Sequence, residues 1–152
     1  MGLYKAVFTM IFLVICFEQL TAQENPLKTG FYVVVANDSC KDSPGFLKIK
    51  DSDGEYCINT NPIVTQDKFT RVVIAADTSK EGIFNTVRIK LDSSFAQKFK
   101  GITEKLVGER IAFIIDNKIV AAPVLRDPIE SGEIAVYADD ETIKLIKEEL
   151  IK

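Results

Sequence analysis

The chain has no histidine among its 152 residues, and this absence excludes several kinds of active site. Without an imidazole there can be no Ser-His or Cys-His nucleophilic pair, and most transition-metal sites lose their usual ligand. No glycine-rich phosphate loop is present either, because Ser52-Asp53-Gly54 lies between two short apolar segments, as in a hairpin turn. No other catalytic group of residues is evident. We therefore expect a protein that is not an enzyme and that has no cofactor, no metal and no small-molecule substrate.

An excess of charge of one sign is also lacking. The chain has 19 lysines and arginines against 22 acidic residues, for a net charge of −3, and the basic residues are scattered. Proteins that bind nucleic acid or anionic membranes usually carry a basic patch. We therefore expect no nucleic-acid partner.

No apolar run is long enough to be a clear membrane-spanning helix. The longest, near the N-terminus, has the features of a signal peptide. Lys5 precedes the apolar residues 6–17, and the small residues Thr21 and Ala22 follow. A run of twelve residues is too short to cross a bilayer comfortably as a helix. We expect a signal peptide over residues 1–22, a leader over 23–30, no membrane span after cleavage, and export to the periplasm or cell envelope.

Cysteine is scarce, with three in the whole chain. Cys16 lies within the predicted signal and would allow a lipoprotein, but Ile15 stands where lipoprotein processing requires a small residue. After cleavage, Cys40 and Cys57 remain, and two cysteines in an oxidising compartment favour a disulfide. It would close a loop of about 17 residues, worth roughly 3 kcal/mol in the chain-entropy model. The alternative is that they are two separate buried thiols.

Apolar periodicity predicts the secondary structure. Strands are expected over residues 31–36, 46–50, 55–58 and 72–76, which together form a β-rich N-terminal segment over 31–76. Residues 77–152 continue with a strand at 86–91, a helix at 94–107, a hairpin at 110–125, a short strand at 134–137 and a helix at 139–152. This order indicates an α+β fold in which an antiparallel sheet carries two helices on one face.

The helix ends are marked by residues of known preference. Asp92, Ser93 or Ser94 can cap the first helix, and Gly108 suits its left-handed C-terminal stop. The acidic residues 139–141 favour the N-terminus of the second helix through capping and the helix dipole.

The hairpin at residues 110–125 is the most informative segment. Its turn is Asp116-Asn117, a pair that tolerates the positive φ required by a two-residue hairpin turn. Both of its faces are apolar, because alternate residues on each side are hydrophobic. Helices can cover one face, and either the N-terminal strands or a partner must cover the other.

From residue 87 to residue 151 the chain resembles the head of the first periplasmic domain of SecD, an accessory subunit of the bacterial preprotein translocase. The similarity rests on the positions of Phe99 and Thr103, on Val-Gly-Glu-Arg-Ile-Ala at 107–112, on Ala122-Pro123 and, more faintly, on 61–65. Asn117 and Ser131 replace glycines of the family, and a further glycine is missing near Val136.

The resemblance implies a SecD head-like, ferredoxin-like fold in a freestanding, exported form. It also implies a binding module that contacts polypeptide or secretion machinery. We expect the contact on the uncovered hairpin face, with Ile114, Val120, Ala122 and Val124 as candidate residues. An alternative is a structural or regulatory protein that docks on one fixed envelope partner, and a third, a hydrolase that works through acids alone.

Overall fold

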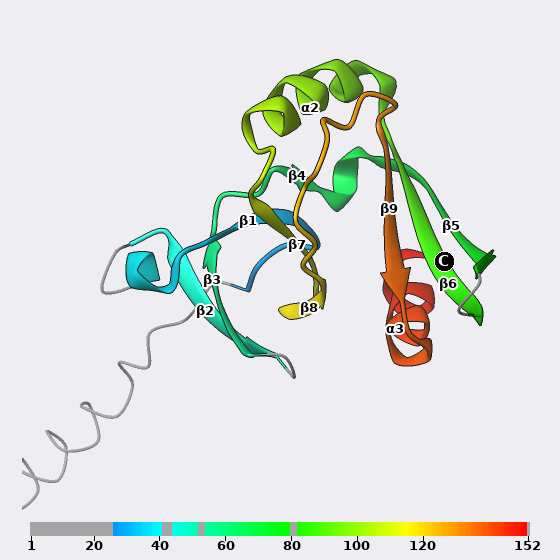
Figure 1. Cartoon of the computed structure of the whole chain (residues 1–152), viewed down its shortest axis with the longest axis horizontal. Coiled ribbons are helices and arrows are strands. Elements are labelled where there is room, and N and C mark those ends of the chain that lie inside the picture. The colour runs from blue at the N-terminus through cyan, green and yellow to red at the C-terminus, as the bar shows by residue number, and fades with distance from the viewer. Residues whose placement is uncertain (1–25, 41–43, 52–53, 80–81, 152) are drawn as a thin grey trace, which may run out of the picture.

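The computed structural model describes residues 26–40, 44–51, 54–79 and 82–151 (Figure 1). The predicted signal peptide, Cys16 and the first part of the leader lie outside the described residues. Within the described ranges, no helix is both long enough and apolar enough to cross a bilayer.

Within the described residues, the fold consists of nine strands and two α-helices, together with two short 3-10 helices, η1 (Asn37–Cys40) and η2 (Gln66–Lys68). In chain order the larger elements are β1 (Gly30–Val35), β2 (Phe46–Asp51), β3 (Gly54–Asn59), β4 (Val64–Thr65), β5 (Phe69–Ser79), β6 (Gly82–Leu91), α2 (Ser93–Lys105), β7 (Arg110–Ile115), β8 (Lys118–Ala121), β9 (Glu133–Ala138) and α3 (Asp140–Leu150).

The strands form two antiparallel sheets. The larger has the order β2-β3-β1-β7-β8, with β4 pairing to the start of β1, and the smaller has the order β5-β6-β9. In the larger sheet the edge strands β2 and β8 lie in contact, so this sheet curls around its own inner face. Figure 1 shows α2 above β9 and α3 beside its lower end.

The main core lies between the two sheets and includes residues of both helices. Phe31 of β1 stacks on Phe113 of β7 with ring centroids 4.5 Å apart, and Phe69 meets Phe31 edge-on at 6.1 Å. Phe99 of α2 and Ile146 of α3 are almost fully buried in the same cluster. Aromatic pairs with these geometries contribute about 0.5–1.5 kcal/mol beyond the area that they bury.

A second core fills the inner face of the curled sheet. Tyr32, Ile58, Ala112 and Ile114 are nearly inaccessible there, and Leu27 is buried in the same cluster. The second apolar face of the 110–125 hairpin is therefore covered from within the chain by N-terminal residues, the first of the two alternatives left open by the sequence.

The sequence predicted one sheet, whereas the structure has two. Strand β7 pairs with β1 and β8 in the larger sheet, and β9 pairs with β6 in the smaller. The larger sheet therefore contains strands from both sides of the boundary predicted after residue 76, and β5, which pairs with β6 in the smaller sheet, crosses that boundary. A ferredoxin-like arrangement in a single sheet, with both helices on one face, is not confirmed.

The predicted turn conformation and helix caps are confirmed. Asp116 and Asn117 have φ values of +47° and +60°, as the two-residue turn requires. The carboxylate of Asp92 accepts a hydrogen bond from the N–H of Ser94 at 2.8 Å, and that of Asp139 accepts one from Thr142 at 2.8 Å. Both helices therefore begin at an aspartate cap.

Candidate functional site

An apolar groove of about 270 Å³ opens between the edges of the two sheets. One wall is the chain that follows β8, residues 123–126, and the other wall is the first part of β9. In Figure 1 the chain after β8 runs upward between β7 and β9. The lining residues are Phe31, Phe99, Ile111, Pro123, Val124, Leu125, Arg126, Ile129, Glu133, Ile134, Ala135 and Val136.

The first wall presents an unpaired stretch of backbone at Val124. The N–H of Ile111 donates to the carbonyl of Pro123 at 2.9 Å, and the N–H of Leu125 donates to the carbonyl of Glu109 at 2.8 Å. Val124 lies between these bonds, in a non-hydrogen-bonded pair with Arg110. In an antiparallel ladder such a residue directs its own N–H and C=O to the opposite side. The Val124 side chain is 46% exposed.

The second wall is the free edge of β9. The N–H of Leu91 donates to the carbonyl of Gly132 at 2.8 Å, which sets the hydrogen-bonding phase of the β6–β9 ladder. By alternation, Ile134 and Val136 bond to β6, and Ala135 directs its N–H and C=O outward. No strand of the described ranges pairs with β9 on that side.

The groove has a rigid apolar floor. Phe31, Phe99 and Ile111 are each at least 94% buried there, and all three belong to the main core. Side chains that are packed in a core hold one rotamer, so the floor is formed before any ligand arrives.

A buried threonine fixes the loop that closes the groove. The Thr103 hydroxyl donates within α2 to the carbonyl of Phe99 at 3.0 Å and accepts a hydrogen bond from the N–H of Ile129 at 3.0 Å. On the solvent-accessible side of the same loop, the Lys100 ammonium lies 2.9 Å from the Glu130 carboxylate, and this hydrogen bond raises the pKa of Lys100. The loop around Ile129 and Glu130 is therefore held to α2 by one buried hydrogen bond and one ion pair at the surface.

The groove carries one charge of each sign, Arg126 and Glu133. Among the described residues, no cluster of histidine, cysteine or acidic side chains could hold a metal ion. With an apolar floor and unpaired backbone on both walls, the site can accommodate an extended chain with apolar side chains.

The four predicted contact residues do not lie together. Ile114 is fully buried in the second core, and Ala122 packs beside that core. Val120 packs on the main core, and Val124 is the one that lines the groove. In this conformation Ile114 cannot reach a partner.

The register of the turn places Val120 on the other face of the hairpin from Ile114, because Ile119 is the residue opposite Ile114 and successive residues of a strand alternate between faces. A β-bulge then separates Ala122 from Val120. Phe113 pairs with Ala121 and Ile114 pairs with Ile119, so Val120 is the extra residue. A bulge puts two successive residues on one side and reverses the alternation beyond it. The sequence pattern carried no signal for this bulge.

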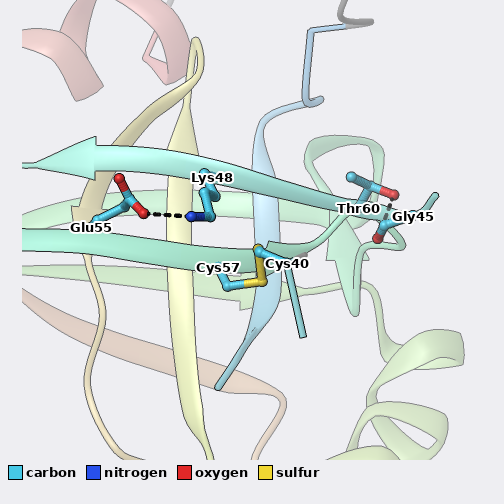
Figure 2. The surroundings of a disulfide bond; sticks show 6 residues. All are labelled: Cys40, Gly45, Lys48, Glu55, Cys57 and Thr60. Carbon is cyan, nitrogen blue, oxygen red and sulfur yellow. Dashed lines mark hydrogen bonds and ion pairs between the residues drawn. A yellow bond between two sulfur atoms is a disulfide. The ribbon is translucent and has the colours of Figure 1, made fainter. Parts of the chain in front are cut away.

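The predicted disulfide is present and lies apart from the groove. Cys40 in η1 is joined to Cys57 in β3 (Figure 2). Beside it, Lys48 and Glu55 form an ion pair of 3.0 Å across the β2–β3 hairpin, and the Thr60 hydroxyl donates to the carbonyl of Gly45 at 3.0 Å. Cys57 is fully buried, so the covalent link joins η1 to an inaccessible position of β3.

Comparison with known proteins identifies the family. The family model described as "SecDF, P1 head subdomain" matches residues 44–144. Protein translocase subunit SecD of Aquifex aeolicus (strain VF5) is 28% identical over 89 residues, which cover 58% of this chain and 17% of the relative. The SecD of Treponema pallidum (strain Nichols) is 30% identical over 107 residues, covering 69% of this chain and 17% of the relative.

Solved structures show the same fold. The crystal structure of SecDF in the super-membrane-facing form has a TM-score of 0.54 at 19% identity, covering 76% of this chain and 17% of that one. A second SecDF structure has a TM-score of 0.53, also at 19% identity, covering 76% of this chain and 58% of that one. The chain thus spans a small part of the curated relatives that it matches, and it belongs to the family of the SecDF P1 head subdomain.

Proposed function

We propose that this protein is a non-enzymatic, exported binding module of the cell envelope that binds extended polypeptide in the groove between β9 and residues 123–126. The observation that carries the proposal is the pair of outward-facing backbone segments at Val124 and Ala135, on opposite walls of one apolar hollow. Strand addition at such an edge derives affinity from main-chain hydrogen bonds and selectivity from pockets for alternate side chains.

The relatives support a role in protein transport. The curated relatives are named protein translocase subunits, and one of the solved structures describes SecDF as a membrane component that enhances protein export. A groove that reads backbone and apolar side chains suits a partner of variable sequence, as transported chains are.

The size of the groove favours weak binding. At about 270 Å³ it is smaller than the pockets of roughly 300–1,000 Å³ that enclose a drug-sized ligand. It can take a short apolar part of a chain, so we expect dissociation constants in the micromolar range.

Two exposed valines provide a matched test of the groove. Val124 on its wall is 46% exposed, and Val107, which does not line it, is 45% exposed. We expect Val124→Asp to weaken binding of a fluorescently labelled, reduced and carboxymethylated protein at least tenfold, and Val107→Asp to leave binding unchanged. Fluorescence anisotropy titration gives both constants.

A proline at the edge of β9 tests strand addition. Ala135→Pro removes an N–H that points away from β6, so the β6–β9 ladder should survive while the edge can no longer donate. We expect loss of binding with an unchanged circular dichroism spectrum. If the wild type fails to bind at high micromolar concentrations, the polypeptide proposal is wrong and docking on one fixed envelope partner takes its place.

Export is the second part of the proposal. It is supported by the signal-like order of Lys5, the apolar residues 6–17 and the small residues near Ala22. N-terminal sequencing of protein recovered from the envelope should begin at Gln23 or Glu24. Recovery of chains that begin at Met1 from the cytoplasm would contradict it.

A further inference from the structure

The smaller sheet has a second free edge, at β5. This strand of 11 residues pairs with β6 on one side, and within the described residues no strand pairs with the other side. β5 does not line the groove. A long edge strand is a ready site for pairing with another chain unless it is blocked.

The direction of the backbone groups along β5 follows from the ladder. Residues 85, 87, 89 and 91 of β6 bond to β9, so residues 84, 86, 88 and 90 bond to β5. Their partners are Phe84 with Asp77, Thr86 with Ala75, Arg88 with Val73 and Lys90 with Arg71. The N–H and C=O groups of Val72, Ile74 and Ala76 therefore point out of the sheet.

The sequence of β5 is self-complementary about one of these residues. If two copies pair antiparallel with Ile74 on a two-fold axis, Val72 of each copy exchanges hydrogen bonds with Ala76 of the other. The same register places Arg71 opposite Asp77 twice, once on each side of the axis. Centring the axis on Val72, Val73, Ala75 or Ala76 instead places Arg71 opposite no acidic residue of β5, so the Ile74 register is preferred.

Within one copy, among the described residues, Arg71 has no oppositely charged partner. Its cross-strand neighbour is Lys90, a like charge, and no ion pair of Arg71 occurs among the described residues. Asp77 lies 3.3 Å from Arg88 and has further acceptor capacity, because a carboxylate has about four lone-pair sites. In the non-hydrogen-bonded position that the register gives to Arg71 and Asp77, side chains approach most closely.

We propose that β5 is a dimerisation edge, and that two copies of this chain pair antiparallel about Ile74 into a continuous six-stranded sheet, closed at each end by Arg71 of one copy and Asp77 of the other. Such an isologous interface buries the same edge of both copies and leaves no β5 edge free to aggregate. The groove remains open in each copy, because β9 lies at the opposite edge of its sheet.

Charge reversal tests the register. We expect the purified wild-type protein to sediment as a dimer at high micromolar concentration in analytical ultracentrifugation. Arg71→Glu and Asp77→Arg, each alone, place like charges opposite one another and should raise the dimer dissociation constant at least tenfold. The double variant restores opposite charges and should recover most of the wild-type association.

A matched control and a second variant keep the test decisive. Lys144→Glu on the exposed side of α3 makes the same charge change as Arg71→Glu away from the edge and should leave the dimer intact. Ala76→Pro removes an outward N–H of an exposed residue and should give a folded monomer, judged by circular dichroism. A wild type that sediments as a monomer overturns the proposal. It does so even if its β5 edge is found to bind unfolded polypeptide instead of a second copy. Single variants that dimerise like the wild type overturn it as well. Neither result depends on binding in the groove.

Discussion

The side chain of Asn117 holds the backbone of Leu27, ninety residues away in the sequence. Its Oδ1 atom accepts a hydrogen bond from the Leu27 N–H at 2.7 Å. Leu27 is buried in the second core, so this hydrogen bond joins the tip of the β7–β8 hairpin to the segment that enters β1. Asn117 therefore adopts the positive φ that the turn requires and also ties two distant segments together.

This contact changes the expected effect of a glycine at the turn. From the turn alone, Asn117→Gly should be neutral or slightly stabilising, since glycine adopts φ of +60° without strain. Loss of the hydrogen bond to Leu27 should instead lower the free energy of unfolding by about 1 kcal/mol. Asn117→Asp keeps an acceptor and should lose less, whereas Asn117→Val should lose the most, because a β-branched residue resists positive φ. Urea denaturation gives the free energies of unfolding of the three variants. A glycine variant as stable as the wild type would show that the hydrogen bond to Leu27 contributes nothing to stability.

The disulfide between Cys40 and Cys57 should be a major source of stability. In the chain-entropy model, a closed loop of this size contributes roughly 3 kcal/mol by restricting the unfolded chain. We expect the variant Cys40→Ala, Cys57→Ala to show this loss in urea denaturation. Alanine is preferred to serine because Cys57 is fully buried and a hydroxyl there would need a partner. Dithiothreitol should destabilise the wild type and leave the variant unchanged, and a similar effect on both would contradict the prediction.

Features set by neighbouring residues were predictable from the sequence. Capping by Asp92 and Asp139, the turn at Asp116 and Asn117, and the positive φ of Gly108 all depend on interactions within a few residues. The disulfide followed from the number of cysteines and the expected compartment. The identification of the family rested on several short motifs together.

Features set by distant pairing were not predictable. The pairing of β7 with β1 is decided by side chains that meet across about 80 residues, as Phe31 and Phe113 do. The groove depends on that pairing, because one of its walls, residues 123–126, continues from β8 in the larger sheet, whereas the other wall is β9 of the smaller sheet. The bulge at Val120 was a second feature that the sequence pattern did not predict. One extra residue reverses which side chains face each core in the part of the strand beyond the bulge.

Two glycines should respond to the same substitution with opposite signs. Gly132 has φ of +64°, and a Cβ there would lie 2.7 Å from the Cβ of Ala96 in α2. Gly101 lies within α2, and a Cβ there would meet no atom within 4 Å. We expect Gly132→Ala to destabilise by about 1–3 kcal/mol through overpacking and strain, and Gly101→Ala to stabilise by about 0.5–1 kcal/mol through helix propensity. Thermal and urea denaturation measure both. Equal shifts would show that the Gly132 loop moves away from α2 without cost.

The cap of α3 should make stability depend on pH in the acid range. Asp139 accepts hydrogen bonds from the Thr142 backbone N–H and side chain, and these lower its pKa in the folded state. A carboxylate with a lowered pKa adds stability that is present above its unfolded pKa, about 3.9, and is lost as the pH falls through the folded pKa. Asp139→Ala should therefore cost about 1 kcal/mol near neutral pH, and the difference from wild type should shrink at about pH 2. Asp139→Asn keeps a neutral acceptor of similar capping strength, so its advantage over alanine should be the same at both pH values. Urea denaturation at the two pH values measures all three proteins, and a difference between wild type and alanine that does not change with pH would mean that the carboxylate charge contributes nothing to the cap.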